Sequence, residues 1–115
     1  MRSELSDKQR LLHVIESIEA VENYFAEIKN YEDFKANSLV LFATIKQLEI
    51  IGEAINHIDV ELLLQQPQIP WNKIIGMRNM LVHEYFGVNP EVIWGVVKHN
   101  LFELKSAVEI IASNC

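Results

Sequence analysis

Apolar side chains recur at steps of three and four residues along most of this chain, which is the period of a helix with one buried face. The first such run follows Ser6, whose side chain can cap a helix while Gln9 reaches back to it. Glutamates lie on the opposite face of this run, so the pattern predicts an amphipathic helix. Its apolar stripe consists of Leu11, Ile15, Ile18, Val21, Phe25 and Ile28.

Three further long helices follow from the same pattern. One spans Ser38 to His57, and another spans Trp71 to Tyr85 and is ended by Gly87. The pair Asn89-Pro90 then marks a new start, because Asn caps helices and Pro suits their first position. The last predicted helix presents one apolar face, made of Ile93, Val97, Leu101, Leu104, Val108 and Ile111.

The segments between these helices are short and polar. Residues 30–37 have room for one helical turn, and residues 59–64 form a short turn before a loop that contains two prolines. No alternating strand pattern and no internal repeat is present. The predicted fold is therefore all-α: an antiparallel four-helix up-and-down bundle with a short extra helical turn. The length of 115 residues is ordinary for a single domain, so one domain is expected over residues 1–115.

Charge and cysteine content narrow the range of functions. The net charge is −6, which argues against a broad nucleic-acid-binding face and confines any anion site to a local patch. The single cysteine, Cys115, allows no disulfide within the chain, as is usual in a reducing compartment. No apolar signal core follows Met1, and charges interrupt the most apolar stretch. A cytoplasmic protein without a membrane span is expected.

The predicted helix Ser38–His57 is unusually apolar. Such a helix must contact several neighbours or a second subunit, which favours a homodimer that associates through helix faces. A narrow polar line made of Lys46, Glu49 and Glu53 interrupts its apolar surface. This line could face a functional groove at the dimer contact, or it could hold an ion pair between Lys46 and Glu49.

Chemically capable side chains are concentrated in residues 78–86, where the third long helix ends. Asn79 and His83 lie four residues apart and share a helix face, about 40° apart in projection. Arg78 and His83 are about 140° apart, so they converge only through the length of Arg78 or the end of the helix. A structural alternative remains open, in which Arg78, His83 and Tyr85 satisfy the carbonyls of the helix C-terminus.

Other catalytic signatures are weak. The four glycines are too scattered for a phosphate-binding loop. The histidines show no metal-ligand spacing, so no metal or other cofactor is expected. The histidines outside residues 78–86 are expected to be solvated or to lie at the edge of the core; they are His13, His57 and His99.

The pattern Arg78-x4-His83-x-Tyr85 resembles the motif of the HEPN superfamily, in its HepT-like branch. Members of this branch are the toxin half of two-gene toxin–antitoxin modules. The resemblance covers most of the chain from the second long helix onward. Its matching segments, in order, are Ile51-Gly52-Glu53-Ala54, Pro70-Trp71, Gly76-Met77-Arg78-Asn79, Leu81-Val82-His83-Glu84-Tyr85-Phe86-Gly87-Val88 and Val92-Ile93-Trp94.

The resemblance implies a helical homodimer that is a metal-independent endoribonuclease toxin of a type II/VII-like system. Arg78 would then hold the scissile phosphate of RNA, since a guanidinium fork suits phosphate oxygens. His83 would act as the acid–base group on the ribose 2′-OH, with products ending in a 2′,3′-cyclic phosphate and a 5′-OH. Asn79 would orient His83 or the phosphate, and Glu53 would be a second supporting residue beside the dimer cleft.

The resemblance also implies a partner. In HepT-like toxins an MntA-like nucleotidyltransferase antitoxin transfers AMP to the motif tyrosine, here Tyr85. The added phosphate charge and nucleotide bulk would block the cleft and compete for Arg78.

Two other functions remain open at this point. The chain could be a non-catalytic subunit that binds a nucleotide or substrate for a minimal nucleotidyltransferase, with Arg78 and His83 binding a phosphate. It could also be a structural dimer in which the polar motif caps a helix.

Overall fold

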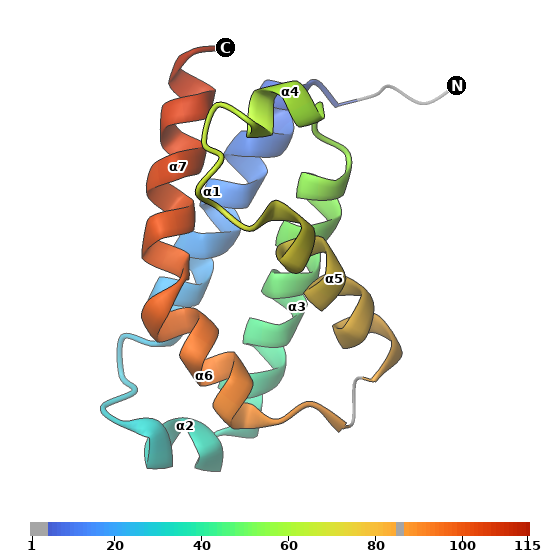
Figure 1. Cartoon of the computed structure of the whole chain (residues 1–115). Helices are drawn as coiled ribbons and strands as arrows, with labels where there is room; N and C mark the ends of the chain where they lie inside the picture. Colours follow the sequence, from blue (N-terminus) through green and yellow to red (C-terminus); the bar gives the residue numbers. More distant parts are fainter. Residues whose placement is uncertain (1–4, 85–86) are drawn as a thin grey trace.

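The computed structural model describes residues 5–84 and 87–115, and every regular element in this part of the chain is a helix. The all-α prediction is therefore confirmed. The long helices run alternately up and down, and both ends of the described chain lie at the same end of the bundle (Figure 1). The elements are α1 Asp7–Tyr24, α2 Tyr31–Ala36, α3 Ser38–Asn56, α4 Val60–Leu63, α5 Trp71–His83, α6 Pro90–His99 and α7 Leu101–Ser113.

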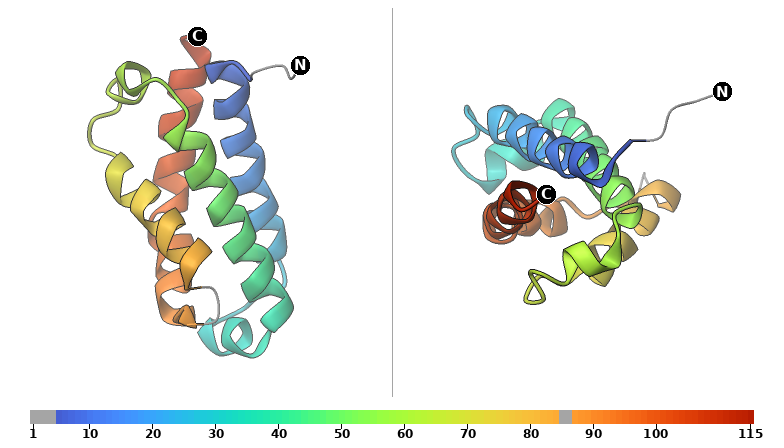
Figure 2. Two further views of the ribbon diagram at one scale, coloured as in Figure 1. Left: turned by 90° about the vertical axis from the view of Figure 1, so that its right-hand side faces the viewer. Right: turned by 90° about the horizontal axis from the view of Figure 1, so that it is seen from above.

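Helix α3 is the centre of the packing. It packs against α1 on one side and α5 on the other, and α1 also packs against α7 (Figure 2). Its buried residues include Ile45, Leu48, Ile51 and Ile55, which join one continuous hydrophobic core. Leu39 points to solvent instead, with 79% of its surface exposed. The apolar surface of α3 thus divides into a core face and an exposed stripe.

The predicted helix starts are confirmed at the caps. The Ser6 side chain accepts a hydrogen bond from the Gln9 backbone, and the Gln9 side chain accepts one from the Ser6 backbone. The Asn89 side chain likewise caps α6, with Pro90 as the first helical residue. Each cap satisfies backbone donors that have no partner inside the helix.

The predicted end of the first helix was wrong. Helix α1 ends at Tyr24, so the apolar residues Phe25 and Ile28 pack on the core from the connection that follows it. Phe25 is held there by ring contacts at 5.1 Å with Phe34 and 6.0 Å with Trp94. The apolar stripe continues past the helix because Phe25 and Ile28 pack, partly buried, on the core without a further helical turn.

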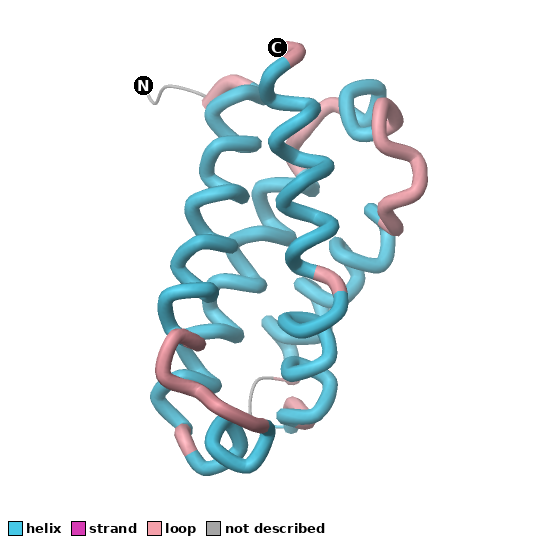
Figure 3. The backbone as a smooth tube through the Cα atoms, turned by 90° about the vertical axis from the view of Figure 1, so that its left-hand side faces the viewer, coloured by secondary structure: helices cyan, strands magenta, loops and turns pink. Residues whose placement is uncertain are grey.

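The last predicted helix is two helices, α6 and α7, separated at Asn100 (Figure 3). The φ angle of Asn100 is −122°, far from the helical value of about −63°. Its side chain makes no cap hydrogen bond. The apolar stripe still runs through both pieces, and the spacing therefore gave no signal of the break.

An ion-pair cluster joins the first and last helices, α1 and α7, which are neighbours in the bundle. Lys105 Nζ on α7 lies 3.3 Å from a carboxylate oxygen of Glu22 and 3.5 Å from one of Glu19, both on α1. The hydrogen bond to Glu22 is the main cause that raises the pKa of Lys105 above its ordinary value. None of the helices in residues 5–84 and 87–115 is long and apolar enough to cross a membrane.

Candidate functional site

Arg78 lies in the second half of α5 and points toward α3. Its Nη2 is 2.6 Å from Oε1 of Glu53, and its Nη1 donates a hydrogen bond of 2.6 Å to Oδ1 of Asn79. A guanidinium carries five N–H donors, so these two contacts leave three for a ligand. The two predicted supporting residues, Glu53 and Asn79, thus meet at Arg78 and fix its orientation.

A glycine makes this arrangement possible. Gly52 is buried in α3 at the point where α5 crosses it. A Cβ at Gly52 would overlap the Cβ of Arg78, and it would lie 2.9 Å from Arg78 Cγ and 3.3 Å from the Ile74 carbonyl oxygen. Close helix approach without a side chain therefore sets the distance between Glu53 and Arg78.

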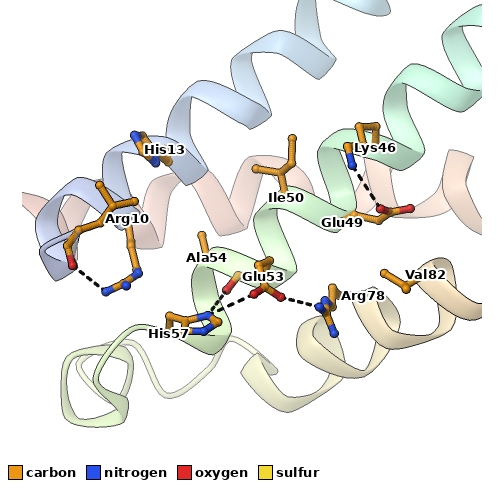
Figure 4. A pocket seen from close by; sticks show the side chains of 11 residues that line it. Arg10, His13, Lys46, Glu49, Ile50, Glu53, Ala54, His57, Arg78 and Val82 are labelled. Atoms are coloured by element: carbon orange, nitrogen blue, oxygen red, sulfur yellow. Dashed lines mark hydrogen bonds and ion pairs between the residues drawn. The ribbon is translucent and has the colours of Figure 1, made fainter. Parts of the chain in front are cut away.

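An open pocket surrounds Arg78, with a volume of about 510 Å³. Its walls come from α1, α3 and α5, with Arg10 and His13 on α1 and Arg78 and Val82 on α5 (Figure 4). The predicted polar line of α3 faces this pocket: Lys46, Glu49 and Glu53 all line it. The alternative ion pair is present as well, since Lys46 Nζ lies 3.9 Å from a carboxylate oxygen of Glu49.

Glu53 also contacts a histidine. His57 follows the last residue of α3, one turn after Glu53, and its Nδ1 lies 3.6 Å from Oε2 of Glu53 and 2.9 Å from the Glu53 backbone oxygen. The two oxygens of one carboxylate therefore face Arg78 and His57 respectively (Figure 4). His57 is half-exposed, as predicted, but it belongs to the Arg78 pocket and not simply to the solvated surface.

His83 is the last residue of α5 and is exposed. It does not line the Arg78 pocket, and among the described residues its side chain makes no hydrogen bond or ion pair with the side chain of Arg78 or of Asn79. Within one chain, Arg78 therefore points toward α3, whereas His83 is exposed at the end of α5. The helix stops two residues before the predicted end, and Tyr85 lies outside the described residues.

The sequence did not predict several of the residues that line the Arg78 pocket. Arg10 and His13 are far from Arg78 along the chain, and no local pattern links them to it. The role of Gly52 had a visible signal, because a glycine inside a strongly apolar helix lowers helix stability and often has a packing reason. Within the described residues, no three His, Cys, Asp or Glu side chains gather in a way that could hold a metal ion.

Comparison with known proteins gives a consistent result. Residues 14–111 match the family described as ribonuclease HepT-like. A protein of Thermococcus cleftensis named as a probable ribonuclease HepT is 40% identical over 104 residues, covering 90% of this chain and 94% of that protein. A candidate RNase of Methanocaldococcus jannaschii is 36% identical with the same coverage of both chains. A candidate RNase of Caldanaerobacter subterraneus is 39% identical over 71% of this chain and 73% of its own length. No solved structure matches the chain.

Proposed function

Because this chain belongs to the HepT-like ribonuclease family, we propose that it is a metal-independent endoribonuclease and the toxin of a type II/VII-like toxin–antitoxin system. The observation that carries the proposal is the arrangement at Arg78. Its guanidinium is fixed by Glu53 and Asn79, lies in an open pocket and keeps three N–H donors for a ligand.

Arg78 binds the scissile phosphate in this proposal. A guanidinium is permanently charged and offers paired donors that match two phosphate oxygens. Donors fixed before the reaction stabilise the negative charge that develops on the phosphoryl oxygens, since no energy is spent on orienting them during the step. Glu53 and Asn79 therefore act as positioning residues for Arg78.

His83 transfers the protons. An imidazole takes the proton of the ribose 2′-OH, and the 2′-oxygen attacks the phosphorus. The bond to the 5′-oxygen breaks, and the leaving oxygen receives a proton that an imidazolium can return. The products are a 2′,3′-cyclic phosphate and a 5′-OH, and the step consumes no water.

The proposed catalytic site is a cleft between two copies of the chain. His83 is exposed and outside the pocket of its own Arg78, which supports a cleft that a second copy completes. An exposed stripe of α3 that combines apolar and charged side chains runs past the pocket, as expected of a surface that meets its own copy. At its start Leu39 and Phe42 would contact the second copy, while Lys46, Ile50 and Glu53, followed by His57 after the helix end, would line the cleft between the copies.

The proposed activity is tested by incubating the purified protein with RNA, and with DNA of the same sequence, in excess EDTA. Intact mass is checked first, so that the protein carries no AMP. RNA is expected to be cleaved while DNA stays intact, because DNA lacks the attacking 2′-OH. If unmodified protein cleaves none of several classes of RNA, the non-catalytic nucleotide-binding subunit becomes the better account.

The second part of the proposal concerns control of the toxin. An MntA-like nucleotidyltransferase antitoxin, acting with the toxin in the cytoplasm, transfers AMP to Tyr85. Tyr85 follows His83 by two residues, so the added phosphate and nucleoside would stand beside the acid–base group. The negative charge would also compete with RNA for Arg78.

Replacing Tyr85 with phenylalanine is expected to prevent AMP transfer while RNA cleavage continues, because phenylalanine lacks the hydroxyl that accepts the nucleotide. Co-incubation with the antitoxin and ATP, followed by intact mass measurement, checks this prediction. Tyr31→Phe is the matched control and should still gain AMP. Modification of the Tyr85→Phe protein to the same extent as the wild type would place the acceptor elsewhere.

A further inference from the structure

Positive and titratable nitrogen groups are concentrated around the Arg78 pocket. Three of the ten Lys and Arg side chains and two of the four histidines line it, against two of the sixteen carboxylates. The chain as a whole carries a net charge of −6. This pocket is therefore a local exception to the acidic surface and can attract an anion.

The cations other than Arg78 are available for a ligand. Lys46 pairs with Glu49 at 3.9 Å, at the limit of an ion pair, and 69% of the Lys46 side chain is exposed. Arg10 lies 3.8 Å from Asp7 and donates a hydrogen bond to the backbone oxygen of Leu5. Ion pairs between partly exposed side chains at this distance are weak, so phosphate oxygens can replace the carboxylates. The His13 side chain makes no hydrogen bond or ion pair within the described residues.

These groups are too widely spaced to share one phosphate. Lys46 precedes Glu53 by seven residues of helix, about 10 Å along the axis of α3. Arg10 and His13 come from α1, whereas Arg78 comes from α5, with α3 between them (Figure 4). Separate side chains around the pocket can therefore face different phosphates of one bound strand.

We propose that Arg10, His13 and Lys46 bind phosphates of the RNA backbone that flank the phosphate held by Arg78. The inference rests on the proposed function in one respect, that Arg78 holds a phosphate of RNA. It adds helix α1 and the first half of α3 to the substrate-binding surface. The bound strand crosses α3 between α1 and α5.

The test measures binding of a short 2′-O-methyl oligoribonucleotide, whose blocked 2′ oxygen prevents cleavage, at several salt concentrations. The variant is Arg10→Gln combined with Lys46→Gln. The control is Lys8→Gln combined with Lys35→Gln, which removes two positive charges from α1 and α2 but none from the pocket. Circular dichroism checks that both proteins keep the helical fold.

The pocket variant is expected to bind at least about tenfold more weakly at 0.1 M salt, and its log–log salt slope should fall by about 1.4, or 0.7 for each lost contact. The control should keep the wild-type slope. Equal slopes for wild type and pocket variant would overturn the inference, as would the absence of RNA binding by the wild type. Binding with the expected slopes but without cleavage of ordinary RNA would uphold the inference and reject the proposed catalysis.

Discussion

Replacing His83 with alanine is expected to lower the rate of RNA cleavage by about 10²–10⁴-fold, the usual contribution of a general acid–base group. The His83 side chain is exposed and makes no hydrogen bond or ion pair within the described residues, so its removal should leave the fold unchanged. RNA binding should also stay close to the wild-type value, since Arg78 and its partners are untouched. Cleavage rate, RNA affinity and melting temperature are measured on the same preparation.

His99→Ala is the matched control. His99 is also exposed and is also the last residue of its helix, α6. If the two histidines served only to complement the helix C-termini, both variants would lose a similar, small amount of stability and neither would change cleavage. The proposal fails if His83→Ala cleaves RNA as fast as His99→Ala does.

Replacing Gly52 with alanine is expected to destabilise the protein by about 1–3 kcal/mol, the usual cost of forcing extra atoms into a packed contact. In an open helix the same substitution stabilises by about 0.5–1 kcal/mol, because alanine loses less backbone entropy than glycine. Here the new methyl group overlaps the Cβ of Arg78, which is close to the backbone of α5 and cannot rotate away. Helix α5 must therefore move, and a displacement of about 1 Å at Arg78 can cost 10²-fold in activity.

Gly76→Ala, in the same helix as Arg78, is expected to have the opposite effect on stability. Gly76 lies in α5 two residues before Arg78, and nothing lies within 4 Å of a Cβ built there. This variant should gain about 0.5–1 kcal/mol and keep its activity. Denaturant unfolding of both variants, with RNA cleavage alongside, separates the two cases. A Gly52→Ala protein at least as stable as the wild type would mean that the close approach of α3 and α5 does not constrain Arg78.

The sequence predicted the fold class and the helix starts because these depend on local signals. Ser6 and Asn89 cap helices through their own side chains, and the caps form where they were expected. Helix ends were harder to predict. The apolar residues keep the same spacing before and after Phe25 and Asn100. This spacing therefore does not show where the backbone stops being helical.

The candidate site was predictable in its residue types but not in its contacts. Arg78, Asn79 and Glu53 were all identified from the sequence, and the structure brings them together. Asn79 was expected to orient His83 or the phosphate, and in the structure its side-chain oxygen Oδ1 accepts a hydrogen bond from the neighbouring Arg78. Arg10 and His13 reach the pocket through the packing of α1 against α3, which no short-range pattern encodes, whereas His57 follows Glu53 by one helical turn.

The most direct test of the central claim is the chemical identity of the RNA ends that the unmodified protein leaves in excess EDTA. Mass spectrometry of the products is expected to show a 2′,3′-cyclic phosphate on one fragment and a 5′-OH on the other, because the 2′-oxygen of the RNA is the nucleophile. A 5′-phosphate with a free 3′-OH would mean that water attacked the phosphorus, and it would contradict the roles assigned to Arg78 and His83.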